Sequence, residues 1–282
     1  MAPFDTGFPT QDAQSDFSRM RRRRVLRRLA NRLRREPGDV DMILPFEEVV
    51  AALGHAGERR VGVQSIELDS IVGTVDRSKD FDRRFRPTSR RVRQRWERMA
   101  EAARRGESFP PISVKRIGTL HFVEDGHHRV SVAIALGRSS IDAHVTVVRT
   151  KVGPGDEMRL GDLPFKGHER LFAERVPLPP EARGQVLVSD PWAYGDLAEA
   201  VEAWGFRAMQ DRGELMSREE VARSWFEEEY RPVVAMLREA GMLGGRGTET
   251  ERYMAIACDR YRFLRTHEWD PGILERLRGR RT

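Results

Sequence analysis

The sequence predicts an α+β protein, with a small mixed-sheet domain followed by a mainly α-helical domain. Residues 61–148 alternate short apolar runs, rich in β-branched and aromatic residues, with segments of helical periodicity. Beyond residue 162, apolar residues recur at helical spacing behind two capping-box patterns. Residues 151–162, with three glycines and a proline, look like a linker. We therefore expect three parts: a disordered start with an arginine-rich helical arm (1–57), the mixed-sheet domain (58–150), and a linker with the helical domain (151–282).

Composition sets the class of protein. A hydrophobic fraction of 39% in 282 residues, with 5 Trp, is enough for a proper core. The 1 Cys excludes a disulfide framework and favours a reducing compartment. No apolar run is long enough to span a membrane, and the N-terminus lacks a secretion signal. We expect a cytoplasmic protein without stable membrane insertion.

The N-terminal part is dominated by arginine. Residues 1–18 show no periodicity and are expected to be disordered. Residues 19–35 contain ten arginines and no acid, so the rest of the chain has a formal charge of −4 (+6 less 10). Apolar residues recur in this segment at helical spacing, which predicts a helix that Pro37-Gly38 ends. The apolar stripe consists of Val25, Leu26, Leu29, Ala30 and Leu33.

Three anionic partners fit the arginine-rich helix: a nucleic-acid backbone, an anionic membrane surface, or an acidic protein. The alternative is that the stripe docks on the body, whose acids meet the arginines. Because the stripe is short, stable membrane attachment is the least favoured of these. The candidate contacts to DNA or another polyanion are Arg21, Arg22, Arg23, Arg24, Arg27 and Arg28.

The elements of the mixed-sheet domain follow from periodicity. After a short helix at residues 44–53, residues 61–72 predict a strand, and residues 73–87 a loop dense in Asp and Arg. A helix is expected at residues 88–105, since Trp96 and its helical neighbours form an apolar face. Strands follow at residues 112–116, 119–124 and 141–148. The first two are joined by a hairpin turn at Ile117-Gly118, and a helix ending at Gly137 precedes the third.

Residues 119–137 (TLHFVEDGHHRVSVAIALG) organise this domain. They predict a strand, a turn at Asp125-Gly126, and a helix. A helix start offers free N–H groups and a positive dipole end, so it can bind anions. Arg129 adds a planar donor fork, and His127 and His128 can donate or accept hydrogen bonds. Ordinary helix capping by Asp125 and local ion pairing of Arg129 are the alternatives. The crowding of polar groups favours a phosphate-binding turn.

Gly126-His127-His128-Arg129, followed by an apolar helix and Gly137, resembles the signature loop of the ParB/sulfiredoxin superfamily. ParB proteins have a Gly-Glu-Arg-Arg run there that binds CTP phosphates. Sulfiredoxins have Gly-Cys-His-Arg, and free serine kinases have an Asp-Gly-His run, which the present Asp125-Gly126-His127 matches most nearly. The resemblance covers roughly residues 60 to 150 and implies a ParB/sulfiredoxin-like fold.

The resemblance implies a nucleotide site, for CTP or for ATP/ADP, with Mg²⁺. Gly126, His127, His128 and Arg129 would contact phosphates, as would Arg77 and Arg84 in the loop after the first strand. The candidate base or metal-binding carboxylates are Asp125, Glu124 and Asp76, with Asp82 as a further candidate. Sulfiredoxin activity is excluded, because His127 stands where the catalytic Cys would be. Zinc ligation by His121, His127, His128 and His144 is not favoured, and we assign no metal ligands.

The resemblance leaves three functions open. The first is a ParB-like nucleotide switch or NTPase that engages DNA through the arginine arm and forms a homodimer. The second is a small-molecule kinase of the free serine kinase type, although Asp76 stands where those kinases use a glutamate. The third is a ParB-like nuclease.

The C-terminal half is expected to be helical. Residues 217–225 (SREEVARSW) begin like a DNA-reading motif, but the acidic FEEEY run that follows makes base reading doubtful. A shielding or dimerising domain is the better interpretation. Capping boxes at Ser217 and Thr248 predict helix starts, and Pro232 predicts a kink or an end of the helix. Cys258 should be buried, and the basic C-terminus should be frayed.

Overall fold

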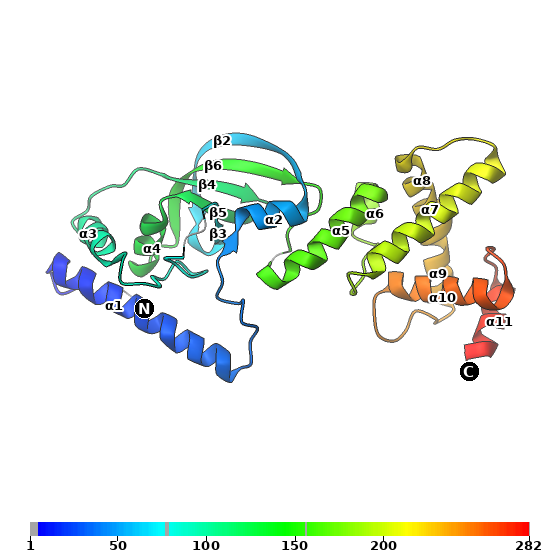
Figure 1. Cartoon of the computed structure of the whole chain (residues 1–282), viewed down its shortest axis with the longest axis horizontal. Coiled ribbons are helices and arrows are strands. Elements are labelled where there is room, and N and C mark those ends of the chain that lie inside the picture. The colour runs from blue at the N-terminus through cyan, green and yellow to red at the C-terminus, as the bar shows by residue number, and fades with distance from the viewer. Residues whose placement is uncertain (1–4, 77–78, 156, 282) are drawn as a thin grey trace. The chain divides into compact units, whose positions relative to one another are not determined.

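The computed structural model describes residues 5–76, 79–155 and 157–281. The chain divides into two compact units, the first ending at Lys166 and the second beginning at Gly167 (Figure 1). The first unit holds a mixed six-stranded sheet, and the described part of the second is helical. A mixed-sheet part followed by a helical part is therefore confirmed. No described helix is both long and apolar enough to cross a membrane.

The sheet has the order β1-β3-β5-β4-β6-β2. Its strands are β1 Leu44–Pro45, β2 His55–Glu67, β3 Ile71–Thr74, β4 Ile112–Ile117, β5 Leu120–Asp125 and β6 Ser140–Thr150. β3 pairs in parallel with β1 and β5, and β4 with β6. The β4–β5 hairpin and the β2–β6 pair are antiparallel. The strands expected at residues 112–116, 119–124 and 141–148 are thus confirmed.

The single strand expected at residues 61–72 is wrong. Its apolar residues belong to two strands, β2 at one edge of the sheet and β3 towards the other. A 3₁₀ turn, Leu68–Ser70, lies between them, and the Ser70 hydroxyl donates to the carbonyl oxygen of Glu67 at 2.5 Å. Periodicity could not reveal the break, because the buried Leu68 continues the apolar pattern through the turn.

Three helices pack near the sheet: α2 Phe46–Leu53, α3 Arg93–Arg104 and α4 His127–Ala135. α2 starts two residues later than expected, because Leu44 and Pro45 pair with β3 as β1. α3 starts at Arg93 rather than at Thr88, whose hydroxyl instead donates to the carbonyl oxygen of Lys79. In the core between helices, the Trp96 indole donates to Ser131 of α4 at 2.8 Å.

The N-terminal helix, α1, spans Pro9–Leu33, so the disorder expected for residues 1–18 is wrong for residues 9–18. Ala13, Phe17 and Met20 belong to the core of the first unit, and the Phe17 ring packs edge-on against Trp96 at 5.5 Å. The buried carboxylate of Asp16 accepts from Arg104 of α3 at 2.7 Å. The polar composition of residues 1–18 did not predict this packing, because two of its acids, Asp12 and Asp16, are buried in the folded chain.

The second unit contains a helical series. Its helices are α5 Leu163–Arg175, which begins within the first unit, α6 Pro180–Arg183, α7 Ala193–Arg212, α8 Arg218–Ser224, a π-helical turn Trp225–Tyr230, α9 Arg231–Glu239, α10 Glu249–Leu264 and α11 Pro271–Arg281. Both capping boxes are confirmed, at Ser217 and at Thr248. α8, the π turn and α9 follow one another without a break, so Pro232 lies within one helical run directly after the π turn and does not end it.

Two expectations for the second unit are wrong. Cys258 is exposed, because α10 turns Tyr253, Ile256 and Arg260 inward instead. The C-terminus is not frayed within the described residues: α11 runs to Arg281 and buries three apolar side chains. Those side chains are Ile273, Leu274 and Leu277.

Candidate functional site

The turn between β5 and α4 has the expected strand-turn-helix form. Gly126 precedes α4 with a positive φ of 108°. A Cβ atom there would lie 2.4 Å from Cγ2 of Ile112, so the position has neither the backbone freedom nor the space for a side chain. This close approach of α4 to β4 explains why the turn requires glycine.

His127 fastens the start of α4 to the end of β3. Its Nε2 lies 2.7 Å from the Thr74 hydroxyl, which can also donate to the carbonyl oxygen of Val123. The imidazole tautomer sets whether His127 Nε2 or the Thr74 hydroxyl is the donor of this pair. Burial lowers the pKa of His127, against the opposing charges of Asp76, Asp125 and Asp80. The imidazole is therefore neutral near pH 7, with its Nε2 hydrogen-bonded to Thr74.

His128 is likewise neutral near pH 7. Its ring meets Phe81 edge-on at 5.3 Å, and its Nδ1 is buried without a hydrogen-bond partner among the described residues. Burial, together with the charges of Arg95 and His127, lowers the pKa of His128 to about 4. It contributes no positive charge to a phosphate site.

The Arg129 guanidinium is hydrogen-bonded to groups of the same chain. One guanidinium nitrogen donates to the carbonyl oxygens of Pro110 and Pro111, at 2.7 and 2.9 Å, and another pairs with Asp125. The fork thereby ties α4 to the segment that enters β4. Arg129 also lines a cavity of about 270 Å³, which Arg138 and Asp142 share.

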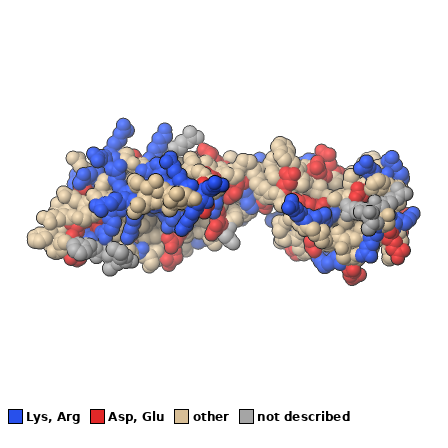
Figure 2. Space-filling model, turned by 90° about the horizontal axis from the view of Figure 1, so that it is seen from below, with Lys and Arg blue, Asp and Glu red and all other residues tan. Residues whose placement is uncertain are grey.

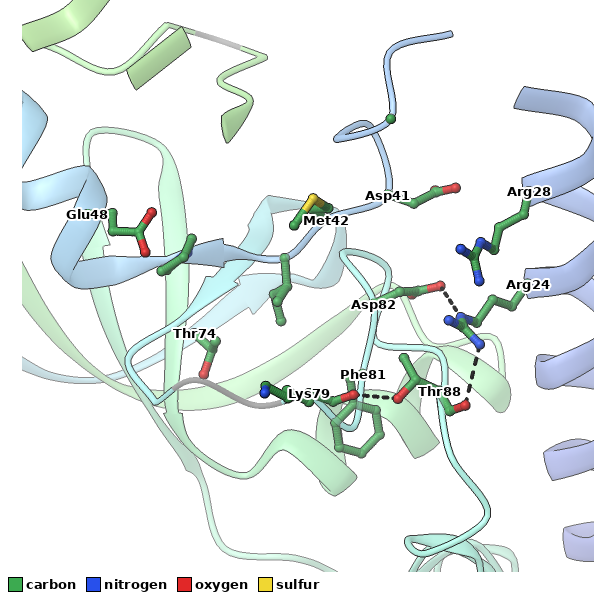
Figure 3. Close-up of a pocket in the computed structure, with 13 residues that line it drawn as sticks. Arg24, Arg28, Asp41, Met42, Glu48, Thr74, Lys79, Phe81, Asp82 and Thr88 are labelled. Atoms are coloured by element: carbon green, nitrogen blue, oxygen red, sulfur yellow. Dashed lines mark hydrogen bonds and ion pairs between the residues drawn. The ribbon is translucent and has the colours of Figure 1, made fainter. Parts of the chain in front are cut away.

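A larger cavity, of about 490 Å³, lies between α1, the chain that enters β1, the end of β3 and residues 79–88 (Figure 3). Three of its lining residues are cations, Arg24, Arg28 and Lys79. Its remaining lining residues are the acids Asp41, Glu48 and Asp82, the apolar Met42, Ile43, Pro45 and Phe81, and Gly38, Thr74 and Thr88. Thr74 and Phe81 both contact His127, so this cavity borders the predicted loop through them. Apolar walls with a few convergent polar groups are typical of small-molecule sites.

An ion-pair network holds one side of the cavity together. Arg24 lies 3.7 Å from Asp82 and donates to the carbonyl oxygen of Thr88 at 3.4 Å. Asp82 also pairs with the buried Arg86 at 2.9 Å, and Arg86 reaches Asp41 at 3.4 Å. Arg27 of α1 pairs with Asp41 at 3.0 Å. Two of the arm's arginines are therefore bound to acids of the body, as the docking alternative expected, but its other half is wrong because the apolar stripe of Val25, Leu26, Leu29 and Leu33 is exposed rather than docked.

The other cations of the cavity have no such partner. Neither Arg28 nor Lys79 makes a side-chain hydrogen bond or ion pair with any described residue, and both are exposed. Glu48 at the start of α2 is likewise a lining carboxylate without a described partner. In Figure 3, Arg28 and Glu48 lie on opposite sides of the cavity. These three side chains are the ones available to a ligand.

The remaining predicted site residues do not line this cavity. Asp76, Arg84, Glu124 and Asp125 are exposed and absent from its lining. Arg77 lies outside the described residues. Within the described ranges, no group of three or more His, Cys, Asp or Glu side chains could hold a metal ion.

Sequence reasoning missed Thr74, Lys79 and Glu48. Lys79 lies in the charged loop that was predicted to face a ligand, so its neighbourhood was identified but the residue was not. No sequence pattern pointed to Glu48, which was expected only as a residue of a short helix. Arg24 and Arg28 were predicted to contact a polyanion, whereas the structure brings them to a cavity of the first unit.

No protein-family model, curated protein or solved structure matches the chain.

Proposed function

We propose that the protein binds a nucleotide, CTP or ATP/ADP, with its phosphates in the 490 Å³ cavity of the first unit. The observation that carries the proposal is the convergence of Arg24, Arg28 and Lys79 on one cavity beside the β5–α4 turn. Arg28 and Lys79 have no described partner to neutralise them, so phosphate oxygens are their natural counter-charge. The superfamily resemblance of residues 126–129 supports the same ligand class.

Different walls of the cavity suit different parts of a nucleotide. Met42, Ile43, Pro45 and Phe81 offer an apolar surface for a base or ribose. Phosphates would lie on the side of Arg28 and Lys79. Mg²⁺ is usually held by one or two carboxylates together with substrate phosphates. Asp41 and Asp82 are already paired with arginines, so Glu48 is the lining carboxylate best suited to that ion.

Nucleotide binding in this cavity would involve side chains of α1 directly. Arg24 is held by Asp82, and an incoming phosphate would compete for the same guanidinium. The cavity thus links ligand occupancy to the helix that carries the outward arginines. This supports the ParB-like switch, in which nucleotide binding changes how α1 is held on the first unit.

Glu48 favours a second candidate function, the small-molecule kinase. Its carboxylate faces the cavity from the side opposite Arg28 (Figure 3), so an acceptor hydroxyl between them would have a base and a phosphate donor within reach. Glu48→Gln would then abolish transfer while leaving the nucleotide affinity measured without Mg²⁺ nearly unchanged. No feature of the described residues favours the nuclease over these two.

Calorimetric titration of the full chain with CTP, ATP, ADP and GTP, each with and without Mg²⁺, tests the proposal. Selective binding of CTP is expected for the switch, and binding of ATP or ADP for the kinase. If the folded protein binds none of the four, the proposal is wrong.

A further inference from the structure

The outward face of α1 carries large apolar side chains that nothing in the described chain covers. Val25, Leu26, Leu29 and Leu33 are between 50% and 86% exposed. At about 100° per residue, the four project within roughly a third of the helix circumference. Ala13, Phe17 and Met20, which dock on the core, project on the opposite side of the helix. The first unit therefore cannot bury this stripe without releasing its own core residues.

Arginines border the stripe on both sides. By the same helical spacing, Arg21 and Arg32 lie along one edge, Arg23 and Arg34 along the other, and Arg22 within it. Figure 2 shows Lys and Arg gathered around a patch of other residues on the face of the first unit seen there. None of these five arginine side chains has a described partner. The surface is apolar along its middle, strongly cationic at its margins, and convex.

A groove extends the same surface toward α3. It encloses about 410 Å³ and is lined by Phe17, Val25 and Leu26 together with arginines from two segments of the chain. Those arginines are Arg21, Arg22, Arg90 and Arg93. Arg93 pairs with Glu97 at 2.6 Å, so the guanidinium groups of Arg21, Arg22 and Arg90 remain around the apolar floor for a ligand that is itself anionic and amphipathic.

The chemistry of the surface separates its candidate occupants. A second copy would bring two sets of arginines together, and their repulsion opposes that pairing. A nucleic-acid backbone would engage the arginines but would leave the four apolar side chains without a role. An anionic bilayer matches both parts: phosphates meet the arginines, and the leucines enter the boundary between headgroups and acyl chains.

We propose that the outward face of α1 docks on an anionic membrane surface, with the helix lying in the plane of the interface. The exposure of the stripe reverses its low ranking from sequence, which assumed that its short length would limit attachment. One short apolar stripe binds weakly alone, but a polybasic border adds electrostatic attraction to anionic lipids to the burial of apolar area. This attachment is peripheral and requires no spanning helix.

Vesicle co-sedimentation of the full chain tests the proposal, with phosphatidylcholine vesicles compared with vesicles containing a third phosphatidylglycerol. The wild type should sediment with the anionic vesicles only, less so as salt increases. Leu29→Gln/Leu33→Gln keeps every arginine and should weaken this binding about tenfold or more, since it removes the buried apolar area. Leu215→Gln, at a leucine 92% exposed in the second unit, is the matched control and should bind as the wild type.

Two outcomes would overturn the proposal: no binding of the wild type to anionic vesicles, or equal binding by Leu29→Gln/Leu33→Gln. Titration of the same proteins with duplex DNA separates the polyanion alternative. If Leu29→Gln/Leu33→Gln no longer binds vesicles but binds DNA as the wild type does, the apolar stripe is needed for membrane binding and not for DNA binding. If Leu29→Gln/Leu33→Gln and Leu215→Gln bind DNA equally well and the wild type does not bind vesicles, the surface is a nucleic-acid-binding surface. None of the substituted residues lines the nucleotide cavity, so this result is independent of the proposed function.

Discussion

Arg129 was predicted to bind phosphate, but its guanidinium is hydrogen-bonded within the first unit. Its fork is bound by Asp125 and by the carbonyl oxygens of Pro110 and Pro111. The loop motif in the sequence revealed the turn, but not the distant prolines, because their approach is a tertiary contact. From sequence alone, loss of Arg129 should abolish nucleotide binding and leave the fold intact. The structure changes that expectation.

Arg129→Ala should destabilise the first unit. Removing the fork leaves the carbonyl oxygen of the half-buried Pro111 without its donor, at a cost of about 1–2 kcal/mol in the free energy of unfolding, whereas water can hydrate the exposed Asp125 and Pro110 carbonyl. Urea unfolding at pH 7 measures this. Arg138→Ala is the control, because Arg138 is exposed and lines the same 270 Å³ cavity without a described side-chain partner. Equal stability of the two variants would contradict the structural role.

Gly126 is the second residue whose role can be tested by stability. Gly126→Ala should lower the free energy of unfolding by about 2–4 kcal/mol, through the left-handed φ and the clash with Ile112. Gly153→Ala, where no atom lies within 4 Å of the added Cβ and φ is not positive, should be nearly neutral. Thermal unfolding followed by circular dichroism compares the two, and a neutral Gly126→Ala would show that the turn tolerates a side chain.

The buried histidines predict a pH dependence of stability. The folded-state pKa of His128, about 4, lies below its usual value near 6.5, so between these values the unfolded chain binds a proton that the folded chain does not. Stability should therefore fall as the pH drops from 7 toward 4. His128→Phe keeps the packing on Phe81 and should lose less unfolding free energy between pH 7 and 5. His121, with a pKa also near 4, and His127, whose pKa burial also lowers, account for the pH dependence that remains in this variant. An unchanged pH slope in His128→Phe would refute this assignment.

At the scale of elements, local patterns predicted well wherever one period ran uninterrupted. β4, β5, α4 and β6 follow their expected bounds within two or three residues. The failures are places where a tertiary contact overrode a local signal. The apolar run at residues 61–72 is broken by a 3₁₀ turn, and the polar start of α1 is ordered by burial of its aspartates against α3.

The docking of α1 rests on few side chains. Phe17→Ala removes the ring that packs on Trp96 and should cost about 3–5 kcal/mol, enough to release the helix. Trypsin should then cut within Arg21–Arg24 much faster than in the wild type. Leu26→Ala, at a position 65% exposed, should leave the cleavage rate unchanged. If Phe17→Ala is cut no faster than Leu26→Ala, α1 is not held in this way.

The same docking changes how the arm should be studied. Deleting residues 1–36 would strip Ala13, Phe17 and Met20 from the core, so a loss of function in that truncation would not identify the arm's role. Point substitutions on the outward face of α1 avoid this difficulty.

At the scale of the whole molecule, the division into a mixed-sheet part and a helical part follows from composition and periodicity. The candidate cavity does not. It joins α1, the chain before β1, the end of β3 and residues 79–88, which are separated by long stretches of sequence. Motif reading identified the turn beside the cavity, whereas the cations that line it come from other segments. Their convergence depends on how α1 packs on the first unit.

The central claim is that this cavity binds nucleotide phosphates, and the most direct measurement is the calorimetric affinity of Arg28→Gln/Lys79→Gln for the nucleotide that the wild type prefers. Both side chains are exposed and unpaired among the described residues, so the variant should fold normally. Loss of two charged contacts should weaken binding by at least about tenfold. The charge-matched Arg22→Gln/Arg32→Gln, on the same helix but outside the cavity, should bind within about twofold of the wild type. Wild-type affinity in Arg28→Gln/Lys79→Gln would contradict the account.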